Sequence, residues 1–247
     1  MHESRPKIAI IAALEREVRP LVRDWSVHAK DYSGRTFRFF ESGNAVLVCG
    51  GIGPEAARRA TQAAIALYSP QWVCSAGFAG ATNESVRVAD ILIPRRVVNA
   101  NDGSSLDTGT GQGILVSFAS VANPDQKARF ASCFAAHAVD MEASAVAQAA
   151  EARSVRFAAV KAISDEIDFA FPAMHDFIGP AGQFHTRKFA LFLLLRPWLW
   201  PAAFRLARNS AQASRALSAA LEQMIESQAE GNMSNSHLDS LQISPRL

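Results

Sequence analysis

Short apolar runs that alternate with helical stretches constrain the fold of this chain more than any other feature. Three runs that are short and apolar enough to form buried strands are 7–13 (KIAIIAA), 71–76 (QWVCSA) and 157–165 (FAAVKAISD). Stretches of helical composition lie between and after them, at 14–22, 55–68, 124–135, 143–152 and 205–228. This alternation is typical of one α/β domain, in which ligands bind beyond the carboxyl ends of the strands.

The composition is that of a folded globular protein without a strong field for nucleic acid. The chain has 247 residues, of which 49% are hydrophobic and 19% charged, and its formal net charge is +2. Its first residues lack the apolar core of a signal peptide, and no run of about 18 apolar residues occurs. We expect a cytoplasmic protein with a single domain over residues 1–228. The polar tail, 229–247, is predicted to be disordered.

The histidines and cysteines are not spaced as metal ligands. The six histidines are scattered, and Cys49, Cys74 and Cys133 show no metal-like pairing. We expect no metal and no other cofactor, and three reduced cysteines buried as small apolar side chains.

Two acidic stretches mark the places where ligand chemistry is expected. Asp140 and Glu142 flank Met141 at the entrance to the helix over 143–152, and Ser164 and Asp165 end the strand over 157–165. Carboxyl groups that converge on one crevice suit the binding and protonation of a polar, nitrogen-bearing substrate. Asp140 is interpreted as an acid that serves the start of the helix.

Three further stretches leave alternatives open. Glu15 and Glu17 lie at the beginning of the helix over 14–22. Either both are solvated acids at a helix start, or one of them takes part in the ligand site. The glycines of 50–54 (GGIGP) either cradle a phosphate or ribose or, as we favour, make a tight strand-to-helix connection. The polar loop over 99–113 is either a substrate lid or a surface excursion.

The segment over 189–204 (FALFLLLRPWLWPAAF) is apolar but interrupted by Arg196 and two prolines. It belongs to a C-terminal extension over 189–228 that follows a core of residues 7–190. Core packing or a dimer contact is the favoured interpretation. A peripheral membrane contact, with Trp198 and Trp200 at headgroup level, is the less favoured one.

Four blocks carry a resemblance to a known family: 7–18 (KIAIIAALEREV), 51–57 (GIGPEAA), 75–80 (SAGFAG) with 88–90, and 139–165. With them the chain resembles the nucleoside phosphorylase superfamily, and within it the methylthioadenosine/S-adenosylhomocysteine nucleosidases. The resemblance covers residues 7–190. It implies a three-layer α/β/α sandwich with a mixed, partly barrel-like central sheet, a small-molecule nucleoside substrate and a homodimer.

The resemblance also implies a role for individual residues. Asp165 would deliver a proton to the purine N7, with Ser164 supporting its loop. Glu142 would bind the ribose hydroxyls, with Met141 against the sugar, and Glu17 would orient the attacking water. The other substrate contacts expected on this basis are Ile52, Phe78, Ala79, Gly80 and Phe118.

Hydrolysis of a purine nucleoside, with release of adenine from methylthioadenosine or adenosylhomocysteine, is the leading hypothesis. Residues 12–17 lack the glycine-and-arginine phosphate loop of the phosphorylases of this fold. The second hypothesis is phosphorolysis with Arg16, Arg19 or Arg58 on the phosphate, including a lipid-linked adenosine such as the substrate of the hopanoid-associated phosphorylase. The third is a nucleoside-binding protein of little activity, because Phe78 stands where the nucleosidases carry a small hydroxyl residue.

Overall fold

The computed structural model describes residues 7–169, 174–179 and 182–229. Its strands are β1 (Ile8–Ala12), β2 (Ser26–Tyr32), β3 (Arg35–Ser42), β4 (Ala45–Cys49), β5 (Trp72–Ala81), β6 (Ile91–Leu92), β7 (Arg96–Asn99), β8 (Ser105–Asp107), β9 (Ile114–Ser117), β10 (Ala138–Asp140) and β11 (Arg156–Asp165). Its helices are α1 (Glu15–Val22), α2 (Pro54–Tyr68), α3 (Pro124–Phe134), α4 (Ala143–Glu151), α5 (Thr186–Leu194) and α6 (Trp200–Ala229), with short 3-10 helices η1 (Met174–Phe177) and η2 (Pro197–Leu199). Apart from Ala229, the end of α6, the predicted disordered tail lies outside the described residues.

One mixed sheet organises the chain. Its strand order is β2-β3-β4-β1-β5-β10-β9-β7-β8, and β11 joins it by pairing with β5 and β6. β5 runs parallel to β1 and β11 and pairs antiparallel with β10 through its last residues, so the sheet branches at this strand. The carboxyl ends of β5, β10 and β11 therefore lie close together.

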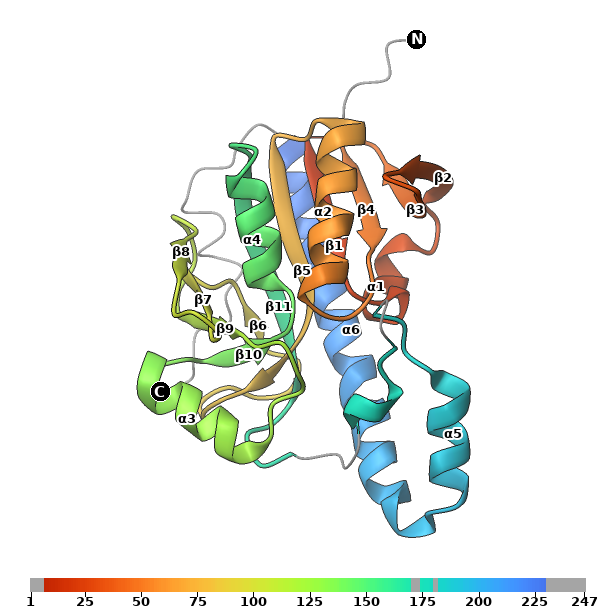
Figure 1. The fold of residues 1–247 in the computed structure, drawn as a ribbon, viewed down its shortest axis with the longest axis vertical. Coiled ribbons are helices and arrows are strands. Elements are labelled where there is room, and N and C mark those ends of the chain that lie inside the picture. The colour runs from red at the N-terminus through yellow and green to blue at the C-terminus, as the bar shows by residue number, and fades with distance from the viewer. Residues whose placement is uncertain (1–6, 170–173, 180–181, 230–247) are drawn as a thin grey trace.

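Helices cover both faces of the sheet (Figure 1). α2 and α4 lie on one face, where buried alanines such as Ala60 and Ala64 allow close packing on the strands. α1 and α6 lie on the other, where Leu217, Leu221 and Met224 of α6 pack against β1, β5 and β11. The predicted fold class, a three-layer α/β/α arrangement around a mixed sheet, is confirmed.

The glycine-rich block at 77–80 belongs to a strand and does not end one. The sequence places the end of a strand at residue 76, but β5 continues to Ala81 and pairs with β11 along most of its length. Local composition hides this because glycine is a poor strand former on its own. The neighbouring strands supply the hydrogen bonds that keep the segment extended.

The polar stretch over 99–113 contains a strand that the sequence did not reveal. β8 pairs antiparallel with β7 at the edge of the sheet. None of residues 99–113 lines the cavity described below, which favours the surface excursion over the substrate lid.

Two predictions about burial are wrong. Cys133, near the end of α3, is exposed and Cys49 is only partly buried, although Cys74 is buried as expected. α5 and η2 contain no buried residue, which contradicts core packing of the segment over 189–204; the dimer contact, the other half of the favoured interpretation, stays a prediction. α5 projects from the body of the molecule beside the first turns of α6 (Figure 1).

Truncating one leucine in each of these helices tests the contrast between them. Leu217 of α6 is 0% exposed and Leu194 of α5 is 66% exposed. We expect Leu217→Ala to lower the free energy of unfolding by about 2–5 kcal/mol, because it opens a cavity in the core. Leu194→Ala, the matched control, should stay within about 0.5 kcal/mol of the parent. Urea unfolding followed by circular dichroism measures both, and equal losses would contradict the assignment of α6 to the core.

Candidate active site

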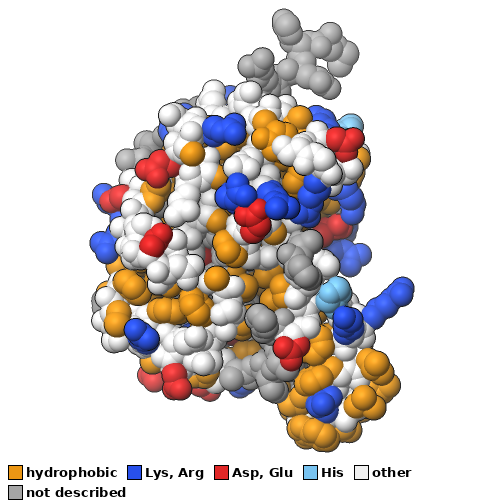
Figure 2. All heavy atoms as spheres, viewed as in Figure 1, with side chains coloured by type: hydrophobic (Ala, Val, Ile, Leu, Met, Phe, Trp, Pro, Cys, Tyr) orange, Lys and Arg blue, Asp and Glu red, His pale blue; other side chains and the backbone are white. Residues whose placement is uncertain are grey.

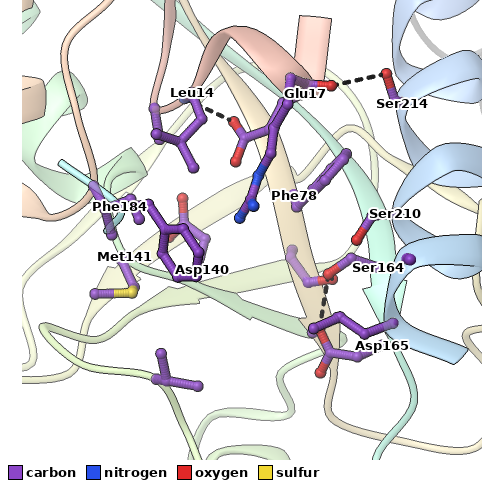
Figure 3. Close-up of a pocket in the computed structure, with 18 of the residues that line it drawn as sticks. Leu14, Glu17, Phe78, Asp140, Met141, Ser164, Asp165, Phe184, Ser210 and Ser214 are labelled. Carbon is purple, nitrogen blue, oxygen red and sulfur yellow. Dashed lines mark hydrogen bonds between the residues drawn. The ribbon is translucent and has the colours of Figure 1, made fainter. Parts of the chain in front are cut away.

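A cavity of about 1060 Å³ opens where the carboxyl ends of β5, β10 and β11 meet the start of α1 and the helices α5 and α6. Nine of the ten predicted site residues line it: Glu17, Ile52, Phe78, Ala79, Gly80, Met141, Glu142, Ser164 and Asp165. In Figure 3, Leu14 and Glu17 lie at one end of the cavity, Ser164 and Asp165 at the other, and Met141 on a side wall. Segments far apart in sequence thus contribute to one site.

Phe118 is the predicted residue that does not line the cavity. Its ring lies 5.4 Å from that of Phe130, centroid to centroid, and it packs against the small apolar core between α3 and β9. The cavity wall that follows β9 is formed instead by Ser120, Val121, Ala122 and Asn123. Local composition singles out an aromatic ring, but the packing of α3 against the sheet decides which way that ring points.

Glu17 is the buried acid of the N-terminal pair. It is on the first turn of α1, and its Oε2 accepts a hydrogen bond of 3.4 Å from the backbone N–H of Leu14. Burial raises the pKa of Glu17 to about 6, although Lys161 and Arg16 act in the opposite direction. Glu15, by contrast, faces solvent and pairs with Arg38.

The glycine turn before α2 holds Glu142. The backbone N–H of Gly53 donates to Glu142 Oε1 at 2.8 Å. The N–H groups of Gly50, Gly51 and Ile52 donate to carbonyl oxygens of the chain itself. The turn is therefore a tight connection, as favoured from the sequence, and its donors are not free to cradle a phosphate.

Burial is the largest cause that raises the pKa of Glu142, and the negative charge of Asp140 is the second; together they raise it to about 7.

A buried ion pair lies beneath the acids. Lys161 Nζ is 2.8 Å from Asp140 Oδ2, and both side chains are almost fully enclosed. Asp140 also accepts hydrogen bonds from Ser117 and from the backbone N–H of Ala143, where α4 begins. Its prediction as an acid that serves the helix start is confirmed. Burial alone would lower the pKa of Lys161, but Asp140, Glu142 and Glu17 outweigh burial and raise it.

Asp165 has a cationic partner that the sequence analysis missed. Lys127 Nζ, from α3, lies 2.5 Å from Asp165 Oδ2 and also donates to the carbonyl oxygen of Glu166 at 2.7 Å. Ser164 donates to the other carboxyl oxygen, Oδ1, at 2.8 Å. Both oxygens of Asp165 are thus held, while its side chain remains 22% exposed. No local pattern marks Lys127, which occupies one position of an ordinary helix.

Two glycines of β5 make room for the acids. A Cβ atom at Gly80 would lie 2.7 Å from Asp165 Oδ2 and 3.1 Å from Lys127 Cε. Gly77, with φ +151, would bring a Cβ to 3.0 Å from Glu17 Oε2. The glycine-rich block therefore serves the close approach of carboxyl groups to a strand.

The opposite side of the cavity is apolar and basic. Its apolar side chains from the segment after β11 and from α5 and α6 are Phe169, Ile178, Phe184, Phe189, Ala203 and Leu206. Its cations, from α1 and α6, are Arg16, Arg19, Arg23 and Arg215. Arg58, one of the predicted phosphate contacts, lies outside the cavity and donates to Glu55 on the exposed face of α2. Among the described residues, no three His, Cys, Asp or Glu side chains are grouped so as to hold a metal ion.

The raised pKa of Glu17 gives a stability effect with a defined sign. The native carboxyl keeps its proton up to about pH 6, whereas the unfolded carboxyl loses it near pH 4.5. The native state therefore binds more protons in this window, and the free energy of unfolding falls as the pH rises through it. A shift of this size corresponds to about 2 kcal/mol.

We expect Glu17→Gln to remove that part of the pH dependence, so that the variant gains about 2 kcal/mol relative to the parent between pH 4.5 and pH 7. Denaturant unfolding at a series of pH values measures it. Glu15→Gln, at the neighbouring exposed acid, is the control and should leave the slope unchanged. Parallel stability curves for parent and Glu17→Gln would contradict the burial of an ionisable group.

Comparison with known proteins agrees with this geometry. The sequence model of the phosphorylase superfamily matches residues 7–133 and 111–187. A 5'-methylthioadenosine/S-adenosylhomocysteine nucleosidase from Staphylococcus haemolyticus is 29% identical over 221 residues, covering 71% of this chain and 94% of that protein. One from Buchnera aphidicola subsp. Schizaphis graminum is 32% identical over 97 residues, so this chain matches only 40% of its length.

Among solved structures, the Helicobacter pylori nucleosidase of the same name superposes with a TM-score of 0.68 at 17% identity, covering 91% of this chain and 99% of that one. At such identity the likeness shows the fold alone. The family match, which extends over most of the chain, shows more: this chain belongs to the phosphorylase superfamily.

Proposed function

We propose that this protein hydrolyses the N-glycosidic bond of a purine nucleoside of the methylthioadenosine/S-adenosylhomocysteine class and releases adenine. The observation that carries the proposal is the convergence of Asp165, Glu142 and Glu17 on one cavity from the ends of separate elements. The nucleosidases named above, which match along the sequence and in fold, support the substrate class. A homodimer, which the resemblance implies, and a cytoplasmic location belong to the same proposal.

The two ends of the cavity suit the two halves of such a substrate. The sugar would lie at Glu142 and Met141, where a carboxylate can accept hydrogen bonds from ribose hydroxyls. As the bond to the base lengthens, positive charge develops on the sugar, and the ionised form of Glu142, which is about half of the molecules near neutral pH because its pKa is about 7, stabilises that charge. Glu17, whose pKa of about 6 leaves it mostly ionised at neutral pH, would orient the water that attacks the sugar.

The base would lie at Asp165, which would take up a proton from solvent as the purine binds and pass it to N7, making the purine a better leaving group. The Lys127 ammonium and the Ser164 hydroxyl each occupy one oxygen of this carboxyl group. We assign Lys127 a positioning role, because it fixes the carboxyl at the strand end and links it to α3. A held acid loses little freedom when the purine arrives, which favours the productive geometry.

Phosphorolysis remains the second candidate because of the basic wall. Arg16 and Arg19 line the cavity on the same helix as Glu17, where they could meet a phosphate. The cavity is at the upper end of the roughly 300–1,000 Å³ of ordinary small-molecule sites, and apolar side chains of α5 and α6 border part of it. That shape favours a bulky apolar group on the 5' side, as in a lipid-linked adenosine.

Adenine release from methylthioadenosine, adenosylhomocysteine and adenosine, each with and without phosphate, tests these alternatives. Hydrolysis predicts release in phosphate-free buffer at a rate that added phosphate does not change. A requirement for phosphate would establish the second candidate. Tight nucleoside binding without release in either buffer would indicate a binding protein.

In the same assay, we expect Asp165→Asn to lower kcat by about 10²–10⁴-fold, because an amide cannot deliver a proton. Glu15→Gln is the control and should retain the parental rate, since Glu15 faces solvent. A near-parental rate in Asp165→Asn, with an unchanged fold, would discard its assigned role.

The positioning role of Lys127 has its own test. We expect Lys127→Met to lower kcat about tenfold to a hundredfold with a smaller change in KM, because the carboxyl loses its tether but the pocket keeps its shape. Lys127→Arg should recover part of the rate, since a guanidinium can still donate to Asp165. Steady-state kinetics on the three proteins decides the matter. Equal losses in Met and Arg variants would assign Lys127 to packing alone.

A further inference from the structure

Six exposed apolar side chains form one ridge at the far end of the molecule. They are Leu191, Leu194 and Leu195 at the end of α5, Trp198 in η2, and Trp200 and Phe204 at the start of α6. Within the described part of the chain, only three other large apolar side chains are comparably exposed, and they do not join this ridge in sequence. Trp198 and Phe204 are each 72% exposed. Figure 2 shows the corresponding apolar patch at the lower right, on the projecting helices.

The ridge is the outer face of a segment whose inner face is already packed. The rings of Phe189 and Phe192 on α5 stand edge-on to Phe177, at centroid distances of 5.2 and 5.1 Å. This aromatic cluster holds α5 to the body of the molecule without using the leucines of the ridge. A contiguous exposed apolar surface of this kind marks an interaction site and is not part of the hydrophobic core.

The charges on the segment over 177–221, which carries the ridge, are all of one sign, whereas the exposed Asp176 lies just before it in η1, which contacts α5. Residues 177–221 contain no Asp or Glu but six basic residues, which are Arg187, Lys188, Arg196, Arg205, Arg208 and Arg215. Arg187 and Lys188 lie on the first turn of α5, while Arg205 and Arg208 lie on α6 just beyond Phe204, and all four are exposed. Apolar side chains, tryptophans and an excess of cations are what the interface of an anionic bilayer attracts.

α5 and α6 meet at a sharp bend that carries the ridge. Among the described residues, no single helix is long and apolar enough to span a membrane. The pair formed by α5 and the segment from Pro197 onward has the required composition, but it is bent by 112° at its break. A spanning helix needs about 20 apolar residues in line. The bend instead presents the ridge as a blunt corner.

We propose that this ridge docks on the surface of an anionic phospholipid bilayer, with its leucines, tryptophans and Phe204 in the headgroup region and its cations on the lipid phosphates. The cavity continues into the same helices, because Phe189, Ala203 and Leu206 line it. Docking would therefore set the apolar side of the cavity next to the bilayer. The inference concerns the surface and holds whichever nucleoside the cavity takes.

Vesicle co-sedimentation of the full chain tests the docking. The probe is a vesicle of phosphatidylcholine with one third phosphatidylglycerol, compared with phosphatidylcholine alone. We expect the protein to sediment with the anionic vesicles at low salt. It should bind the neutral vesicles much more weakly, and it should also bind the anionic vesicles much more weakly in about 0.5 M salt. No binding to the anionic vesicles at low salt would overturn the proposal.

A triple variant, Leu194→Ser with Trp198→Ser and Phe204→Ser, should bind at least about tenfold more weakly, because it removes apolar contacts outside the cavity. The matched control, Val27→Ser with Leu67→Ser, changes exposed apolar side chains elsewhere and should bind like the parent. Thermal unfolding establishes that both variants fold, and sedimentation velocity gives their oligomeric state. If the triple variant binds vesicles as well as the parent does, docking is refuted. If the triple variant is a monomer where the parent is a dimer, docking is also refuted and the ridge is a subunit contact.

Discussion

The ion pair between Lys161 and Asp140 is the interaction on which the site depends. It joins β11 to β10 and to the start of α4, entirely out of contact with solvent. Enclosed charges are costly unless they are paired and hydrogen-bonded, and here Ser75 and Ser117 complete the network. Its cation also acts on Glu17 and Glu142, whose own burial would otherwise be less tolerable. One lysine thus allows three acids to gather under one pocket.

β5 is the strand that brings these groups into one place. It lies between β1 and β11 and turns its last residues to β10, so that elements from both halves of the chain meet at its end. Gly77 and Gly80 leave the space that Glu17 and the Asp165–Lys127 pair occupy. The backbone and the acids are therefore fitted to each other at distances that no larger residue would permit.

The cavity has a division of labour between its two sides. Strand ends and helix starts supply the polar side, where hydrogen bonds hold each acid in a defined orientation. α5 and α6, which belong to the C-terminal extension, supply much of the apolar side, whereas most of its cations come from α1. Under the proposals above, the polar side would determine which bond is broken, and the other side would determine which substituent is accommodated and which surface the protein approaches.

The residues by themselves determined that the chain is an α/β domain and which acids stand at strand ends, because hydrophobic periodicity and acids at strand ends are local signals. The three-layer arrangement and most of the other site residues followed from the resemblance to the family. The sequence could not reveal that β5 continues through its glycines, since the partner strands stabilise that segment. Nor could it show that Lys127 meets Asp165, 38 residues away, or that Phe118 turns into the core while Val121 faces the cavity. The exposure of α5 was likewise decided by tertiary structure, because an apolar helix has the same sequence pattern whether its outer face is covered by other residues or exposed to solvent. Contacts between distant segments depend on how the layers pack, and no local pattern records them.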